Sequence, residues 1–143
     1  MRAVGLLALM LLGASAVASD YNAARAHYHY QMFCQGCHTP DGTGAGSVPR
    51  MKDHVGIFLN SERGRAYLVQ VPGSATSVLS DDHLAEVLNW MIEAFAGDSL
   101  DPEFKRYRGD EVGVLRASPL NETVNLRAAI LAELAAEQGA TAR

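Results

Sequence analysis

The residues with the most distinctive chemistry are two cysteines and a histidine, spaced as Cys34-Gln35-Gly36-Cys37-His38. In such a C-x-x-C-H segment, one helical turn can present both thiols to the two vinyl groups on one edge of a haem. The imidazole that follows can then bind the iron. The spacing therefore predicts one covalently attached haem c, with Cys34 and Cys37 as its anchors and His38 as the proximal axial ligand.

Two other uses of a C-x-x-C pair need features that this sequence lacks. Disulfide-exchange sites of the thioredoxin kind follow a β-strand of an α/β fold, and no strand is predicted before Cys34. Structural zinc needs two further ligands, whereas the chain has no other cysteine and no H-x3-5-H spacing. Haem attachment is the favoured interpretation.

The elements that must position this motif are predicted to be helices. Apolar residues at three- and four-residue steps, good N-cap residues and glycine or proline stops indicate an all-α protein. After the motif, glycines and prolines predict a loop over Thr39–Arg50. The predicted helices cover Asp20–Gln35, Glu62–Gln70 (ended by Pro72-Gly73), Asp81–Ala96, Asp110–Ala117 and a last one opened by Ser118-Pro119 and reaching about Gln138.

The clearest of these helices is Asp81–Ala96, which Ser80 can cap and Gly97 can end. Trp90 points away from its apolar stripe, so the helix is expected to pack on more than one side. The chain between Gly97 and Gly109 is expected to be extended and pinned by apolar side chains, namely Leu100, Phe104 and Tyr107. The predicted stripe of the last helix consists of Val124, Ala128, Leu131 and Ala135.

The stretch from about Tyr28 to Ala96 resembles the class I cytochrome c family. In that family a first helix leads into C-x-x-C-H, a Gly/Pro loop follows, and a last helix with a Ser-Asp-Asp type cap crosses the first. The resemblance implies a cytochrome c-like haem-binding helical domain with, in this chain, a C-terminal helical extension. It also implies that the carbonyl of Pro49 accepts a hydrogen bond from His38 and orients that ligand.

The resemblance breaks at the second axial ligand, because Val71–Leu79, where the family usually carries a methionine, contains neither Met nor His. Met51 is the first candidate for the distal ligand, with packing against the haem as its other interpretation. Met91 and His54 are further candidates, and a five-coordinate iron is the remaining alternative. The other histidines near the two helices are expected to be solvated, namely His27, His29 and His83.

The first eighteen residues have the features of a secretory signal peptide: Arg2, an apolar run and small residues up to Ala18. The run is shorter than the roughly 20 residues of a spanning helix, so we expect an exported, periplasmic protein that does not span the membrane. Residues 19–97 are the predicted cytochrome c domain and residues 98–143 the extension. Without Arg2 the net charge is near −5, which disfavours nucleic-acid binding.

These features predict a periplasmic carrier, and not an enzyme, that passes single electrons between redox proteins such as a dehydrogenase and an oxidase. Two alternatives stay open. A five-coordinate haem would bind a small gas or peroxide, and the long extension would suit the electron-accepting subunit of a periplasmic dehydrogenase. The sequence leaves undecided whether the extension packs on its own domain or on a partner.

Overall fold

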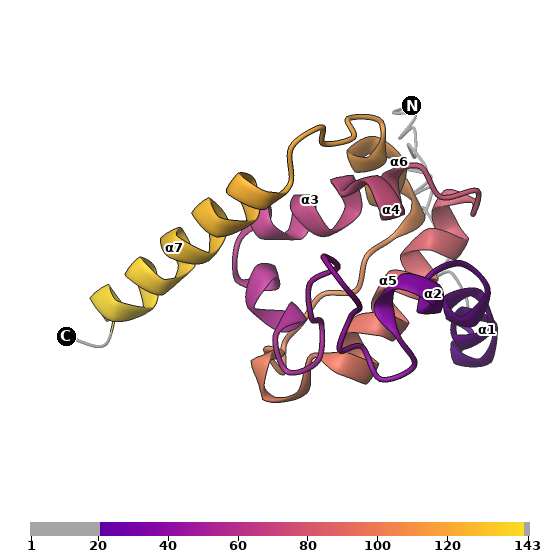
Figure 1. Cartoon of the computed structure of the whole chain (residues 1–143), viewed down its shortest axis with the longest axis horizontal. Helices are drawn as coiled ribbons and strands as arrows, with labels where there is room; N and C mark the ends of the chain where they lie inside the picture. The colour runs from indigo at the N-terminus through magenta and orange to yellow at the C-terminus, as the bar shows by residue number, and fades with distance from the viewer. Residues whose placement is uncertain (1–20, 142–143) are drawn as a thin grey trace, which may run out of the picture.

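The structure, a computed structural model, describes residues 21–141, so the predicted signal peptide lies outside the described residues (Figure 1). All regular structure within this range is helical, which confirms the all-α prediction. None of the helices in this range is long and apolar enough to cross a membrane. The elements are α1 (Ala23–Phe33), α2 (Gln35–His38), η1 (Val55–Asn60), α3 (Glu62–Gln70), α4 (Pro72–Ala75), α5 (Asp81–Phe95), η2 (Gly97–Ser99), α6 (Gly109–Arg116) and α7 (Val124–Thr141).

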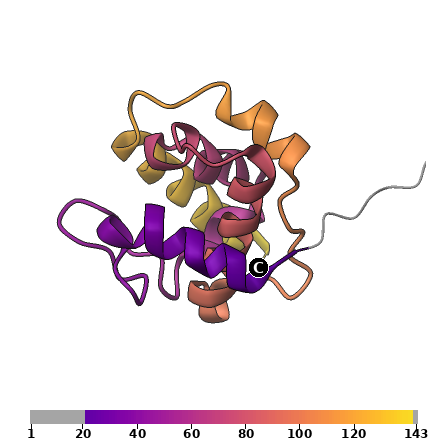
Figure 2. The same ribbon diagram turned by 90° about the vertical axis from the view of Figure 1, so that its right-hand side faces the viewer.

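Helices α1 and α5 pack together and frame the C-x-x-C-H motif (Figures 1 and 2). Tyr30 of α1 is fully buried, with its ring 5.0 Å from Trp90 and 5.3 Å from Phe95. At the other end of the contact, Arg25 makes a two-pronged ion pair with the buried Glu86. Aromatic burial of this kind contributes roughly 2–3 kcal/mol per ring, and it fixes the end of α1 from which Cys34 follows.

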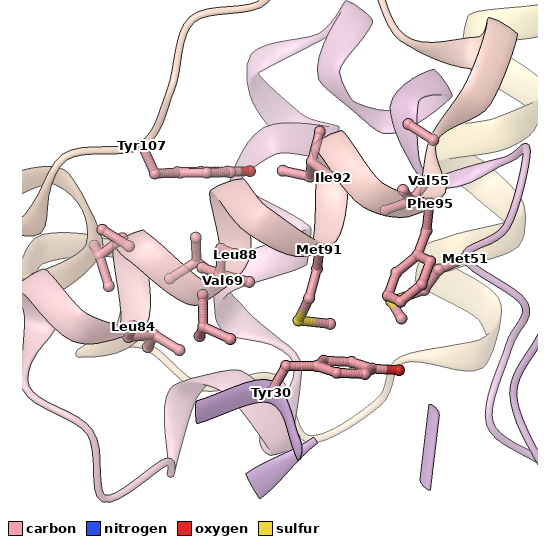
Figure 3. Close-up of a cluster of buried hydrophobic side chains, with 14 of the residues drawn as sticks. Tyr30, Met51, Val55, Val69, Leu84, Leu88, Met91, Ile92, Phe95 and Tyr107 are labelled. Carbon is pink, nitrogen blue, oxygen red and sulfur yellow. The ribbon is translucent and has the colours of Figure 1, made fainter. Parts of the chain in front are cut away.

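The main core surrounds α5 on more than one side, as predicted from the position of Trp90. Figure 3 shows Tyr30 and Tyr107 on opposite sides of this helix, with Met91 directed toward Tyr30. The cap predicted at Ser80 is present, because its hydroxyl accepts a hydrogen bond from the His83 N–H. Members of this core include Tyr30, Met51, Val69, Leu79, Leu84, Leu88, Met91, Ile92, Phe95 and Tyr107.

Residues 98–141 pack on the same chain. Tyr107 is 3% exposed and Val112 of α6 is fully buried, both in the main core. A second cluster forms where Ile130 and Leu134 of α7 meet the stacked rings of Phe58 and Tyr67. The far end of α7 projects from the body (Figure 1). The extension therefore packs part of its apolar side chains against its own domain, while Val114 and Val124 stay exposed.

The predicted start of the last helix is wrong. Helix α7 begins at Val124 and not at Pro119, because the Leu120 N–H donates to the carbonyl of Gln70 and holds residues 118–123 across α3. The carboxylate of Glu122 then accepts the first free N–H groups of the helix, as a capping side chain does. The predicted stripe is also wrong at Val124, Ala128 and Ala135, which are exposed, and only its Leu131 packs against the second cluster. The buried face follows Leu126, Ile130 and Leu134 instead.

Two other boundaries differ from the prediction. The first predicted helix, Asp20–Gln35, is shorter in the structure, because α1 covers Ala23–Phe33. Cys34, with φ and ψ of −122° and −40°, separates it from the short helix α2. Helix α3 has the predicted bounds, but the chain after Gln70 does not become a loop at Pro72. Pro72 starts α4, because proline at the first helical position needs no N–H partner.

Candidate functional site

The C-x-x-C-H segment forms one tight turn at the junction of α1 and α2. The backbone N–H groups of Cys37 and His38 both donate to the carbonyl of Cys34, at 3.1 and 3.0 Å. Both thiols are free, with Cys34 half-buried beside the main core and Cys37 exposed. Burial, and then the neighbouring Cys37, raise the pKa of the Cys34 thiol to about 11. The turn therefore presents two unpaired thiols from one short stretch of backbone.

The imidazole of His38 is held largely inside the protein. Its Nδ1 atom is buried and has no hydrogen-bond partner among residues 21–141. Burial lowers the pKa of His38, so the ring is neutral at physiological pH and its lone pair is available to a metal. The predicted hydrogen bond from His38 to the Pro49 carbonyl is not formed. That carbonyl lies against Gly44 instead, where an added Cβ would come within 3.1 Å of its oxygen.

The loop Thr39–Arg50 closes on itself through short-range hydrogen bonds. Asp41 accepts from the hydroxyls of Thr39 and Thr43, and these hydrogen bonds lower the pKa of its carboxyl group. Gly42 has a φ of +74° and leaves no room for a side chain, since a Cβ would lie 2.7 Å from the ring of Phe95. The carbonyl of Gly42 accepts from the N–H of Met51 at 2.8 Å. The loop thus fixes the position of Met51.

Met51, the first candidate for the distal ligand, is a core residue in this structure. Its side chain is 7% exposed and lies beside Phe95, as Figure 3 shows. Met91 is 8% exposed and fills the space between α5 and Tyr30. Each methionine therefore occupies a packed apolar site.

The histidines differ from the expectation that all but His38 and His54 are solvated. The ring of His27 is exposed but stacks on Trp90 at 4.6 Å. His29 and His83 are half-buried and their ring centroids lie 4.9 Å apart. Burial, and then the nearby His83, lower the pKa of His29. His54 lies at the start of η1 with its ring edge-on to Phe58 at 6.1 Å.

One residue that the sequence analysis missed organises the segment before α5. Arg116, at the end of α6, donates to the carbonyls of Ala75 at 3.1 Å and Leu79 at 2.8 Å, and also to that of Ser77. It makes a further contact with Asp81, the first residue of α5. Nothing in the local sequence distinguishes this arginine from a basic residue placed in a last helical turn, because its three acceptors lie about forty residues earlier in the chain.

The residues of the site fit a covalently attached haem. Thiol addition to a vinyl group joins sulfur to one carbon of the double bond and the thiol hydrogen to the other, and it consumes nothing else. Two free thiols on one turn can do this on one edge of a porphyrin. An imidazole directly after them is a suitable iron ligand, and the pKa of His38, lowered by burial, favours the neutral form that binds a metal.

The helical fold and this attachment turn define a c-type cytochrome: the chain belongs to the class I-like monohaem cytochrome c family, and its cofactor is one covalently bound haem c. It is 33% identical over 134 residues to cytochrome c-552 of Thermus thermophilus (strain ATCC 27634), an alignment that spans 80% of this chain and 87% of the relative. A second cytochrome c-552 of Thermus thermophilus is 32% identical over 106 residues, spanning 61% and 81%. No family model matches the chain, and no solved structure matches it.

Proposed function

We propose that Cys34 and Cys37 anchor the haem, that His38 is its proximal iron ligand, and that the chain carries single electrons between redox proteins outside the cytoplasmic membrane. The observation that carries this proposal is the turn at the α1–α2 junction. It combines two free thiols with a half-buried imidazole. The bound haem supplies the redox chemistry by cycling between ferric and ferrous iron.

The protein contributes attachment, orientation and exclusion of water. Cys34 packs against the main core while Cys37 is exposed, so one anchor is fixed inside the domain and the other lies at its surface. An attachment edge at the surface leaves a short route for electron exchange with a partner. The export prediction and the family membership support an exported dehydrogenase as electron donor, or an oxidase as electron acceptor.

Covalent attachment is tested by expressing the protein together with haem c maturation machinery and extracting it with acidified acetone. The wild-type chain should retain its haem, and its pyridine haemochrome spectrum should be that of two thioether bonds. Cys34→Ser and Cys37→Ser should each shift this spectrum to that of one thioether. Gln35→Ala, which alters the same turn but no anchor, should match the wild type. Haem that is extracted from the wild-type protein would contradict the proposed attachment.

Electron transfer is tested on the same preparation. The haem-loaded protein should be reduced and reoxidised reversibly, with a one-electron Nernst curve in a spectroelectrochemical titration. His38→Ala, which removes the proposed proximal ligand, should change the oxidised and reduced spectra and displace the midpoint potential. An unchanged spectrum and potential in that variant would contradict the assignment of His38.

A further inference from the structure

Two histidines from different helices face each other where α1 packs on α5. His29 lies on α1 and His83 in the first turn of α5, and their ring centroids are 4.9 Å apart, with the ring planes inclined by 55°. Both rings are half-buried. The ion pair between Arg25 and Glu86, one helical turn away on each helix, joins the same two faces. The distance between the two imidazoles is therefore set by the packing of the helices and not by loops.

The imidazole of His29 has a polar atom without a partner. Its Nδ1 atom is buried and makes no hydrogen bond to any of residues 21–141. Buried side-chain polar atoms in proteins nearly always have a partner, and an exception calls for an explanation such as a bound ion or water. The ring of His83 lies beside this imidazole but does not provide the missing hydrogen bond. A ring nitrogen of this pair is therefore left to bind something other than the protein.

The spacing of the two rings matches that of two imidazoles bound to one metal ion. A ring nitrogen binds Zn²⁺ at about 2.0–2.1 Å, which places the centroid of the imidazole roughly 3.2 Å from the metal. Two such rings at a coordination angle of roughly 90–110° have centroids about 4.5–5.2 Å apart. The observed distance of 4.9 Å lies in this range. A metal ion shared by the two rings therefore needs no movement of the helices toward each other.

The surroundings of the pair favour neutral imidazoles. Burial, and then the positive charge that His83 would carry, lower the pKa of His29. A ring that resists protonation keeps its lone pair for a metal, because the proton competes for the same nitrogen. The carboxylate of Glu86 lies close enough to both rings to interact with their charges. Arg25 opposes this attraction, but its guanidinium is paired with Glu86 itself. The pair thus combines neutral nitrogen ligands with a nearby negative charge.

We propose that His29 and His83 together bind one divalent late-transition-metal ion, of the class of Zn²⁺, Ni²⁺ and Cu²⁺, between α1 and α5. Imidazole is a preferred ligand of these ions, whereas Mg²⁺ and Ca²⁺ prefer oxygen ligands. Residues 21–141 contain no group of three or more histidine, cysteine, aspartate or glutamate side chains placed to hold a metal ion, so water completes the coordination. Neither histidine belongs to the haem attachment, and the proposal does not depend on it. The bound ion links the two helices that frame the attachment turn.

The test is a zinc titration of the oxidised, haem-loaded protein, purified without a polyhistidine tag and followed by isothermal titration calorimetry. The wild type should bind one Zn²⁺ per chain, and Ca²⁺ should give no heat of binding. His29→Gln and His83→Gln should each weaken the affinity by about tenfold or more, because each loses one of the two protein ligands. His27→Gln is the matched control. It removes an exposed histidine that stacks on Trp90, and it should bind Zn²⁺ as the wild type does.

Thermal unfolding provides a second measurement on the same samples. An ion that binds only the folded protein stabilises it, so Zn²⁺ should raise the melting temperature of the wild type and of His27→Gln. The melting temperatures of His29→Gln and His83→Gln should respond much less. Circular dichroism without zinc shows whether each variant is folded. If one of the two variants does not fold, the other decides, because the site needs both histidines.

Either of two results would overturn the proposal. A wild-type protein that gives no heat of binding and no change of melting temperature with Zn²⁺ has no such site. Equal affinities in the wild type, His29→Gln and His83→Gln would place the bound metal elsewhere on the chain. Neither result bears on the haem attachment, which is measured by extraction with acidified acetone.

Discussion

The side chain of Asn89 pairs with both backbone polar groups of Tyr107. Its amide nitrogen donates to the Tyr107 carbonyl at 3.0 Å, and its amide oxygen accepts from the Tyr107 N–H at 2.7 Å. Both residues are buried. The pair joins the centre of α5 to the start of the extension. It provides hydrogen-bond partners for the backbone N–H and carbonyl of Tyr107, which is buried and lies outside any helix.

Replacement of Asn89 should loosen this junction. Asn89→Ala leaves a buried N–H and a buried carbonyl of Tyr107 without partners, and we expect it to lower the free energy of unfolding by about 2–4 kcal/mol. Urea unfolding of the haem-loaded protein measures this. Asn125→Ala, at an exposed position of α7, should change it by less than about 0.5 kcal/mol. Equal losses of unfolding free energy in the two variants would contradict a stabilising role of the buried Asn89–Tyr107 hydrogen bonds.

Arg116→Ala should destabilise the protein by about 2–3 kcal/mol, because three backbone carbonyls lose a charged donor. Arg116→Lys should recover only part of this loss, since one ammonium group cannot reach the separate acceptors as the guanidinium fork does. Hydrogen exchange should rise at the amides of residues 74–79 in the alanine variant. Arg108→Ala is the matched control, because Arg108 is 74% exposed and pairs with an equally exposed Asp110. Faster exchange in this control as well would argue against a specific clamp.

The loop after the attachment turn should be sensitive to a methyl group at Gly42 and less sensitive at Gly46. Both glycines have positive φ, +74° and +60°, but only Gly42 lies against a ring. Gly46→Ala should cost about 1–2 kcal/mol for the left-handed backbone alone. Gly42→Ala adds a clash with Phe95, and we expect it to cost about 1–3 kcal/mol more. Thermal unfolding should give a lower melting temperature for Gly42→Ala than for Gly46→Ala. Similar melting temperatures in the two variants would contradict the close contact between Gly42 and the ring of Phe95.

The ion pair of Glu86 should make stability depend on acid. Burial alone would raise the pKa of this carboxyl group, but hydrogen bonds from Arg25 and from the Asn22 N–H outweigh it and hold the pKa below the ordinary value of 4.5. A folded-state pKa below the unfolded one stabilises the protein above pH 4.5, and the stabilisation is lost as the pH falls through the folded-state value.

Glu86→Gln should therefore reduce the free energy of unfolding at pH 7. The free energies of unfolding of the variant and of the wild type should become more similar as the pH falls below 4.5. Urea unfolding between pH 3 and pH 7 measures the two profiles. Glu103→Gln, which removes an exposed glutamate, should follow the wild-type profile. A difference in unfolding free energy between Glu86→Gln and the wild type that stays constant from pH 3 to pH 7 would contradict the ionised carboxylate of Glu86 as the origin of the pH dependence.

Much of the helical framework was predictable because its signals are local. The cap at Ser80, the cap at Ser61 and the stop at Gly97 act within one turn of the helix that they bound. The last helix was predicted wrongly at its start for the opposite reason. Ser118-Pro119 has the local form of a helix start, but the hydrogen bond from Leu120 to Gln70 spans fifty residues and overrides it.

The haem attachment could be predicted from the amino-acid sequence, because C-x-x-C-H requires only one turn of helix and three side chains whose spacing is fixed by the backbone. The burial of Met51, the lack of a hydrogen-bond partner for the Nδ1 atom of His38, and the hydrogen bonds from Arg116 to Val71–Leu79 follow from the tertiary structure and not from local sequence. These outcomes depend on which distant segments compete for the same space and the same polar groups.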